Sequence, residues 1–254
     1  MVNVGVLGLG TVGSGVVELI EVNRSTISKR LGKGVNVKKV LVKNLDKKRS
    51  PLVEGKVTDD VKEILEDRDI SIVVELMGGE NPALAYIKEA LSLGKHVVTA
   101  NKEVIAKHGQ ELLALAKANN VNLFFEASVA GGIPILRPMK QCLAANEVTK
   151  VMGILNGTTN YILTQMGEKG ESFDAALKEA QDKGFAEADP TDDVKGFDAA
   201  RKLAILSSIA FNTRITPDKI YTQGIDTIEP VDIEYAKENG YAIKLVGVGT
   251  CCPA

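Results

Sequence analysis

A glycine-rich turn directly after the first apolar segment constrains the fold of this chain more than any other feature. Val2–Leu7 has the composition of a short buried strand, and Gly8, Gly10 and Gly13 follow it in the spacing G-x-G-x-x-G. In such a turn the first glycine permits a tight bend, the second lets the main chain approach a pyrophosphate, and the third lets the next helix pack closely on the strand. The turn predicts a dinucleotide site, and an ordinary strand–helix turn is the alternative.

Strand-like and helix-like segments alternate through the first half of the chain. This alternation predicts an α/β fold, a Rossmann-type doubly wound parallel sheet with helices on both faces. The expected strands after the first are 35–42, 70–76, 96–99 and 122–126. The expected helices run from the glycine turn to about Leu31 and over 61–66, 82–93 and 103–119.

The alternation stops after Glu126, where helices and strands become segregated. The expected helices there are 133–144, 159–168, 173–183 and 194–211, and the expected strands are 148–155 and 241–248. We therefore expect a dinucleotide-binding domain over 1–127 and a smaller α+β domain over 128–254. The segment 241–248 is expected to form an exposed apolar edge of that second domain.

Composition excludes several other classes of protein. Hydrophobic residues make up 44% of the 254 residues, which is enough for a substantial core, and 31 basic against 33 acidic residues give no reason to expect a nucleic-acid partner. No segment resembles a signal peptide or a membrane span. The 3 cysteines form no C-x-x-C pair, so a cytoplasmic, reducing location is expected and a zinc site is not. We expect structural roles for His96 and His108.

The end of the second expected strand bears on the choice of nicotinamide cofactor. An NAD site usually has an acidic residue there to bind the ribose hydroxyls, but this strand is followed by Lys43 and Asn44. Asp46 comes later and precedes Lys47, Lys48 and Arg49, whose charges would suit a 2′-phosphate. The sequence therefore favours NADP over NAD, with a solvated basic loop as the alternative interpretation.

Two segments of the first domain carry further candidate chemistry. Lys102 follows a strand and opens a helix, where the helix dipole disfavours its positive charge and so suits an acid/base role. An exposed first-turn lysine is the alternative. Glu126 precedes the glycine-containing segment 127–134 and could gather carbonyl oxygens around a hard cation, or could cap a hinge between domains.

Two segments of the second domain are rich in polar groups. Residues 156–160, Asn-Gly-Thr-Thr-Asn, join a strand to a helix and could cap that helix, hold a polar substrate, or do both. Four acids crowd the segment 184–193 before an apolar helix. Asp198 and Lys202 then lie four residues apart on one helix face, near the expected wet end of the helix, where with Glu187 they could bind an ammonium group and move a proton.

Taken together, these segments resemble the homoserine dehydrogenase family. The chain has GLGTVGSG at its start, TANK at 99–102, EASVAGGIP at 126–134, NGTTNYIL at 156–163 and GFAEADPTDDVKGFDAARKLAI at 184–205, in the order and spacing of that family. The resemblance covers nearly the whole chain. The last two motifs are specific to the family, whereas the first is shared by many dehydrogenases.

The resemblance implies roles for particular residues. Lys202 and Lys102 match lysines linked with proton transfer, and the residues expected at the substrate are Glu187, Asp198, Asn156 and Thr158. Lys43 takes the place of an arginine found near the 2′-phosphate in many members. The residues expected at the cofactor are Gly8, Gly10, Thr11, Val12, Gly13, Lys43, Thr99, Ala100, Lys102 and Gly184. A sodium site is implied at Glu126, Val129, Gly131 and Ile133.

The activity that this resemblance implies is the NAD(P)-dependent interconversion of L-homoserine and L-aspartate 4-semialdehyde, a step in threonine, methionine and isoleucine biosynthesis. The resemblance also implies that the domain over 128–254 serves substrate binding and dimerisation, and a homodimer is expected if the sheet of this domain is complete. The family pattern continues past 249–254, so we expect a C-terminally truncated catalytic region without a regulatory domain. The alternatives are an inactive or partner-dependent dinucleotide-binding fragment and a related amino-acid semialdehyde dehydrogenase.

Overall fold

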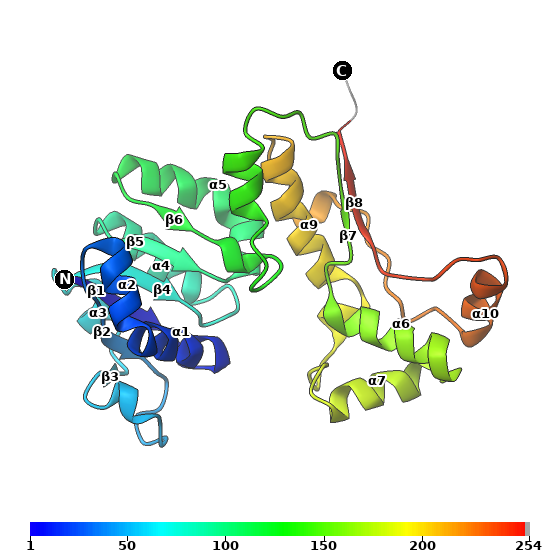
Figure 1. Cartoon of the computed structure of the whole chain (residues 1–254), viewed down its shortest axis with the longest axis horizontal. Helices are drawn as coiled ribbons and strands as arrows, with labels where there is room; N and C mark the ends of the chain where they lie inside the picture. The colour runs from blue at the N-terminus through cyan, green and yellow to red at the C-terminus, as the bar shows by residue number, and fades with distance from the viewer. Residues whose placement is uncertain (252–254) are drawn as a thin grey trace. The chain divides into compact units, whose positions relative to one another are not determined.

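The computed structural model describes residues 1–251, and these divide into two compact units. Unit 1 comprises Met1–Pro134, and unit 2 begins at Ile135 (Figure 1). Within residues 1–251 no helix is long and apolar enough to cross a membrane. Each unit is described separately below.

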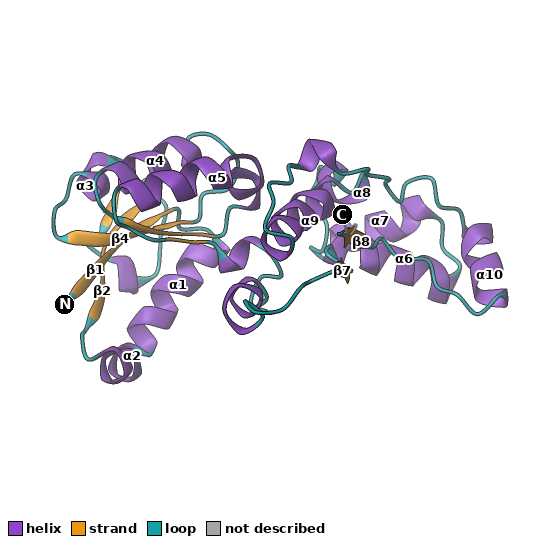
Figure 2. Ribbon diagram, turned by 90° about the horizontal axis from the view of Figure 1, so that it is seen from above, coloured by secondary structure: helices purple, strands orange, loops and turns teal. Residues whose placement is uncertain are grey.

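Unit 1 is built on a six-stranded parallel sheet in the order β3-β2-β1-β4-β5-β6. Its strands are β1 (Val2–Leu7), β2 (Val35–Leu41), β3 (Val57–Thr58), β4 (Ile70–Glu75), β5 (His96–Thr99) and β6 (Leu123–Phe124). Figure 2 shows helices on both faces: α1 (Thr11–Val22) and α2 (Arg24–Leu31) on one, and α3 (Lys62–Leu65), α4 (Ala83–Ser92) and α5 (Lys102–Ala118) on the other. The doubly wound fold predicted from the alternation is confirmed.

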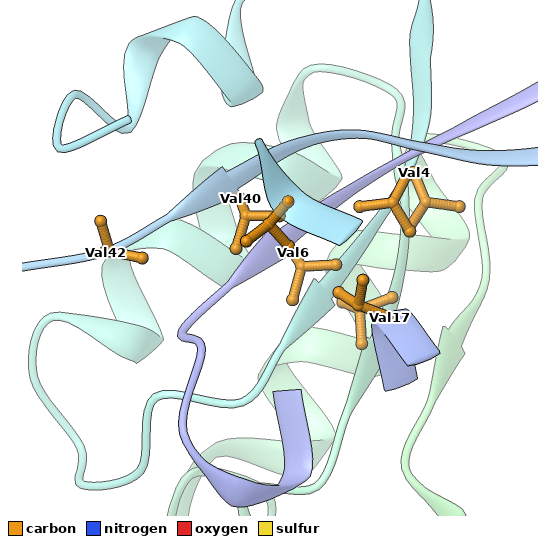
Figure 3. Packing of buried hydrophobic residues seen from close by; sticks show 8 residues of the cluster. Val4, Val6, Val17, Val40 and Val42 are labelled. Atoms are coloured by element: carbon orange, nitrogen blue, oxygen red, sulfur yellow. The ribbon is translucent and has the colours of Figure 1, made fainter. Parts of the chain in front are cut away.

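Branched side chains fill the space between this sheet and α1. Figure 3 shows Val4 and Val6 of β1 packed with Val17 of α1 and Val40 of β2, and Val42 lies just beyond the end of β2. Val6 and Val40 are completely buried. β-branched side chains suit a pleated strand that is covered by helices. The packing therefore fixes the end of β1, and with it the start of the glycine turn.

The largest difference in unit 1 from the sequence prediction is a break in the first helix. The expected single helix to Leu31 ends at Val22, and α2 begins at Arg24. Asn23 lies between them, and its side-chain amide donates to the carbonyl of Leu19 (3.1 Å). Asparagine competes with the helical hydrogen bonds in this way, which explains why the apolar periodicity alone missed the break.

A buried lysine joins the starts of β4 and β5 at the amino-terminal edge of the same sheet. Lys95 precedes β5 and donates from Nζ to the carbonyls of Asp67 (2.6 Å) and Ile70 (2.7 Å). Its burial lowers the pKa of the Lys95 ammonium below the ordinary lysine value, and the nearby Asp67 charge opposes this effect. Replacing Lys95 would leave two carbonyls without their donor and destabilise unit 1, while the contacts at the opposite edge of the sheet stay in place.

Unit 2 combines helices with a small antiparallel sheet. Its helices are α6 (Gly157–Lys169), α7 (Phe173–Asp182), α8 (Thr191–Val194), α9 (Phe197–Ala210) and α10 (Pro230–Glu238), and its strands are β7 (Lys150–Gly153) and β8 (Gly247–Thr250). One buried cluster joins α6 to α7, to the end of α8 and to the loop segments on either side of α10. It includes Ile162, Met166, Ala176, Ala180, Val194 and Ile225.

Three expected elements of unit 2 were wrong in extent. The helix predicted over 133–144 is only a π-helical turn, Pro138–Cys142, because Pro138 lacks an amide hydrogen in the middle of the segment. The strand predicted over 241–248 begins only at Gly247. Ile243 and Leu245 pack against the helical cluster instead of pairing with another strand.

The third of these elements is the helix predicted over 194–211, which divides into α8 and α9 at Gly196. That residue has a φ of +82°, and a Cβ there would lie 3.0 Å from Thr222 Cγ2. Only glycine readily combines this left-handed conformation with such a close approach. The helix α10 was not predicted.

Candidate active site

The three glycines of the first motif have three different surroundings. Gly8 has a φ of +97°, and a Cβ there would lie 2.8 Å from the carbonyl oxygen of Leu76. A Cβ on Gly13 would lie 2.1 Å from the carbonyl oxygen of Gly8, so α1 contacts the turn directly. Gly10 has no neighbour within 4 Å of its Cβ position. Gly8 and Gly13 therefore make close backbone approaches, and Gly10 leaves the turn open.

The glycine turn borders a cavity of about 1200 Å³ in unit 1. The cavity is lined by the turn, by the first turn of α1 including Thr11, by Leu76 and Met77 after β4, and by the loop after β2. Val12 does not line it and is exposed. The open side of Gly10 and the amides at the start of α1, which has no side-chain cap at Gly10, suit a pyrophosphate. The residues present therefore fit a dinucleotide.

The loop after β2 brings several cations to this cavity. Lys43, Lys47, Lys48 and Arg49 all line it. Arg49 is folded back on its own loop, where it donates to the carbonyls of Lys47 (2.7 Å), Leu45 (3.3 Å) and Asn44. The guanidinium thus organises the loop, while the three lysines supply positive charge at the cavity wall. The sequence analysis treated all of these cations alike and missed this division.

The end of β5 and the start of α5 lie at the carboxyl edge of the sheet. Lys102 is the first residue of α5, as predicted, and Asn101 caps the helix by accepting from the Val104 amide (3.1 Å). Thr99 is buried, and its hydroxyl donates to Glu75 (2.6 Å) and accepts from the Asn101 amide (2.9 Å). Ala100 is half-buried between them. The hydroxyl of Thr99 therefore forms hydrogen bonds within the protein, between the end of β4 and the turn before α5.

The residues expected around sodium lie together at the end of unit 1. Glu126 opens a short 3₁₀ turn, Glu126–Ser128, and Val129 is buried directly after it. Ala130 and Gly131 follow with φ values of +60° and +57°, and the exposed Ile133 donates its amide to Ala130 O (3.0 Å). In the part of the chain that the structure describes, no three His, Cys, Asp or Glu residues gather as metal ligands. Main-chain carbonyls and one carboxylate remain as candidate ligands.

Unit 2 buries a polar cluster around the first turn of α9. Asp198 Oδ2 accepts from Lys202 Nζ (2.6 Å) and from Asn156 Nδ2 (2.8 Å). Lys202 Nζ also donates to the carbonyl of Leu155 (2.8 Å), and Asn156 Nδ2 donates to Asp193 (2.6 Å). One ammonium group and one amide are thus fixed by a carboxylate whose residue is only 2% exposed.

The pairing of Asp198 with Lys202 was predicted correctly, but its position was not. The sequence analysis placed both residues at the wet end of the helix. The Asp198 side chain is 3% exposed and that of Lys202 is 19% exposed. The error arose because the helix begins at Phe197 after the left-handed Gly196, which directs its first turn inward. A surface pair contributes little to stability, whereas removing one partner from a buried pair costs about 3–5 kcal/mol.

Thr158, Gly184 and Glu187, which were also expected at the substrate or cofactor, lie in the first turn of α6 and in the loop after α7. Thr158 is buried in the first turn of α6 and donates to the carbonyl of Phe185 (2.8 Å). Gly184 and Glu187 lie exposed in the loop after α7, where the Gln181 side chain donates to the carbonyl of Glu187 (3.1 Å). Thr158 therefore contacts the loop that carries Gly184 and Glu187.

The sequence analysis missed the bridging role of Asn156. Its Oδ1 caps α6 by accepting from the Thr159 amide (2.8 Å), while its Nδ2 joins Asp193 to Asp198. Capping and a polar role were both predicted as possible for this segment. The acceptors of the amide could not be read from the sequence, because Asp193 and Asp198 are distant in the chain.

The strand order of unit 1 and its glycine turn define the chain as one of the dinucleotide-binding proteins with a Rossmann-type fold. A family model described as "Homoserine dehydrogenase, NAD binding domain" matches residues 8–126. A second model, described as "Homoserine dehydrogenase", matches residues 134–252.

Individual relatives agree with these matches. The homoserine dehydrogenase of Bacillus subtilis is 48% identical over 248 residues, which are 97% of this chain and 57% of that protein. The solved structure of a homoserine dehydrogenase from Thiobacillus denitrificans is 46% identical with a TM-score of 0.95, over 99% of this chain and 58% of that one. A putative homoserine dehydrogenase structure from Archaeoglobus fulgidus is 35% identical with a TM-score of 0.88, over 98% of this chain and 81% of that one.

The chain belongs to the homoserine dehydrogenase family. It spans somewhat more than half the length of the curated relatives that it matches.

The structure predicts that Asn156→Ala will destabilise unit 2 more than the loss of a helix cap alone. The substitution removes the cap of α6 and also the donor that joins two carboxylates. We expect the free energy of unfolding to fall by about 2–3 kcal/mol in urea denaturation. Ser172→Ala is the control, because Ser172 only caps α7 (3.3 Å to the Ala175 amide), and we expect a loss of about 1 kcal/mol. Equal losses for the two variants would contradict the bridging role.

Proposed function

We propose that this chain catalyses the NAD(P)-dependent interconversion of L-homoserine and L-aspartate 4-semialdehyde. The observation that carries the proposal is the buried cluster of Lys202, Asp198 and Asn156, which presents an ammonium group held at a fixed place by a carboxylate. The names of the relatives support the choice of substrate. The open glycine turn of unit 1 supports dinucleotide binding.

Oxidation of homoserine requires that the proton of its hydroxyl group leaves as the carbon is oxidised. The bound nicotinamide would supply the hydride acceptor. Lys202 would exchange the hydroxyl proton, because its side chain is partly exposed and its Nζ is oriented by Asp198 and by the Leu155 carbonyl. Lys102, at the first position of α5, is the second candidate for proton exchange.

The substrate ammonium group would be bound by carboxylates of unit 2. Asp198 is fixed by its two donors, and Glu187 is exposed on its loop and so accessible to an incoming cation. Asn156 would orient Asp198, and Thr158 would hold the loop that carries Glu187 through the Phe185 carbonyl. Gly184, with a φ of +75° on the same loop, would contact the cofactor through its main chain.

We further propose that NADP is preferred over NAD. No acid follows β2 directly, and Lys43, Lys47 and Lys48 line the cavity there. A hyperthermophilic archaeal homoserine dehydrogenase solved in complex with NADPH is 28% identical to this chain, with a TM-score of 0.80. Gly8, Gly10 and Thr11, which line the cavity, would hold the pyrophosphate together with the main-chain amides of Val12 and Gly13. Thr99, Ala100 and Lys102 would border the nicotinamide at the carboxyl edge of β5.

The proposal includes a sodium ion and a reducing, cytoplasmic location. Sodium would be held by the Glu126 carboxylate and by main-chain carbonyls of Val129, Gly131 and Ile133, in a segment whose left-handed residues turn the backbone. Oxygen ligands of this kind suit a hard cation. Cys142 is an exposed free thiol, which fits a reducing compartment.

We also propose a homodimer formed through the sheet of unit 2. Met152 of β7 and Val248 of β8 are register partners on one face of this sheet, and they are 63% and 48% exposed. Ile154 and Val246 extend the same face. The opposite face packs on α9, because a Cβ on Gly247 would lie 3.6 Å from Leu203. Sedimentation velocity of the full chain measures its oligomeric state, and a monomer at all concentrations would contradict this proposal.

The activity is tested directly by homoserine oxidation with the full chain. NADP and NAD are compared as acceptors, and choline chloride is compared with sodium chloride. Homoserine-dependent formation of NAD(P)H supports the proposal. Dinucleotide binding without this reaction would favour a binding fragment that is inactive or that depends on a partner. Activity only with another amino-acid semialdehyde or its alcohol would favour the related dehydrogenase.

Lys202→Ala is expected to lower kcat about 10²–10⁴-fold, which is the usual contribution of one positioned acid or base. The dissociation constant of NADPH should stay within about twofold, because the proposed role of Lys202 is proton exchange with the substrate and not binding of the cofactor. Steady-state kinetics and nucleotide fluorescence measure the two quantities. Lys195→Ala is the control, since Lys195 forms an exposed ion pair with Asp226 (2.7 Å). Near-native turnover in Lys202→Ala would remove that lysine from the mechanism.

Lys43→Ala is expected to weaken NADPH binding by about tenfold, or ~1.4 kcal/mol, and to change NADH binding little. The reason is that its charge would be lost beside a 2′-phosphate that NADH lacks. Fluorescence titration with both nucleotides measures the effect. Lys33→Ala removes an exposed lysine near the other end of β2 and serves as the control. Tighter binding of NADH than NADPH by the unmodified chain would contradict the preference.

A further inference from the structure

A buried glutamate at the carboxyl edge of the sheet has no role in the mechanism proposed above. Glu75 is the last residue of β4 and is 0% exposed. In the sheet it pairs with Leu7 at the end of β1 and with Thr99 at the end of β5. The strand order reverses between β1 and β4, and ligands of doubly wound sheets bind at such a reversal. Glu75 therefore lies directly beneath the place where a dinucleotide would bind.

The carboxylate of Glu75 is held by one donor from each of two loops. Its Oε1 accepts from the main-chain amide of Met77 (2.8 Å), in the loop that leaves β4. Its Oε2 accepts from the hydroxyl of Thr99 (2.6 Å), at the end of β5. A buried carboxylate with both oxygens engaged connects two segments that are more than twenty residues apart.

The hydrogen bonds of Glu75 belong to a chain of hydrogen bonds that closes into a ring. The Thr99 hydroxyl accepts from the Asn101 amide (2.9 Å), and the Asn101 side chain donates to the carbonyl of Gly79 (2.7 Å). Gly79 lies in the same loop as Met77, so this loop closes the ring. The turn before Lys102 and the loop after β4 are therefore fixed to each other through Glu75.

One wall of this ring contacts the glycine turn. A Cβ on Gly8 would lie 2.8 Å from the Leu76 carbonyl oxygen and 3.2 Å from Met77 Cα. Leu76 and Met77 also line the cavity that Gly8 and Gly10 border. The position of the Met77 amide, which Glu75 fixes, thus determines where the loop meets the first glycine of the turn.

We propose that Glu75 is a positioning residue for the dinucleotide: it fixes the loop after β4 against Gly8 and the turn that starts α5 at Lys102. This inference rests on the dinucleotide binding proposed above and needs no homoserine turnover. Glu75 touches neither the substrate nor the cofactor. Its effect reaches the cofactor through Met77 on one side and through Thr99 and Asn101 on the other.

Glu75→Gln is the most direct test, because the amide keeps the shape of the side chain and offers only one acceptor oxygen. Either the amide nitrogen faces the Met77 N–H, donor against donor, or it faces the Thr99 hydroxyl, whose proton then loses its acceptor. One loop must shift in both cases. Thr99→Val is the second variant. It removes the hydroxyl that joins Glu75 to the Asn101 amide and leaves the Met77 contact with Glu75 in place.

The matched control is Lys95→Met. Lys95 is also buried and also joins separate segments through two hydrogen bonds, but it lies at the amino-terminal edge of the sheet. If Glu75 merely stabilised unit 1, a comparable loss of stability at either edge would have the same effect on binding. Urea denaturation of each full-length variant provides this comparison of stabilities.

Dinucleotide binding is measured by NADPH fluorescence titration of the full chain, without homoserine. We expect Glu75→Gln to raise the dissociation constant at least tenfold and Thr99→Val to raise it about threefold to tenfold. Lys95→Met should leave it within twofold. We also expect faster amide hydrogen exchange in the 76–79 segment of Glu75→Gln than in the same segment of Lys95→Met.

An unchanged dissociation constant in Glu75→Gln would overturn the inference, as would an equal rise in Lys95→Met. A chain that binds NADPH but does not oxidise homoserine would refute the proposed activity, and the expected rise in Glu75→Gln would still support this inference. A chain that binds no dinucleotide at all would overturn both.

Discussion

The structure of unit 1 depends on the close approach of α1 to the turn that precedes it. A Cβ on Gly13 would lie 2.1 Å from the carbonyl of Gly8, so any side chain there would force the helix away from the sheet. Val17 would then lose its contact with Val4 and Val6, because the valine core is formed across the same interface. Backbone contact at the turn and apolar packing behind it are therefore parts of one constraint.

Both units bury a carboxylate next to their candidate chemistry, and each carboxylate accepts hydrogen bonds from separate segments. In unit 1 Glu75 connects the loops after β4 and β5. In unit 2 Asp198 connects α9 to the start of α6 through Asn156. A buried carboxylate that accepts hydrogen bonds from separate segments holds those segments in one geometry. Fixed geometry is what proton transfer and cofactor binding require.

Local pattern was sufficient for much of this fold. The glycine spacing, the apolar strands and the capping residues placed β1, β4, β5 and α5 within a residue or so, because each of these elements obeys rules that operate over a few positions. The same rules failed for 133–144 and for 241–246. Pro138 interrupts the first segment, and Ile243 and Leu245 of the second pack on helices that the local sequence does not contain.

The sequence by itself determined the fold class, the family and the residue types available for chemistry, since these follow from spacing along the chain. Only the tertiary structure decided that Asp198 is buried, that Asn156 joins Asp193 to it, that Arg49 binds its own loop and that Glu75 accepts hydrogen bonds from Met77 and Thr99. The physical reason is that burial and long-range hydrogen bonds depend on which distant segments contact each other in the fold. The pattern of a single sequence does not show these contacts.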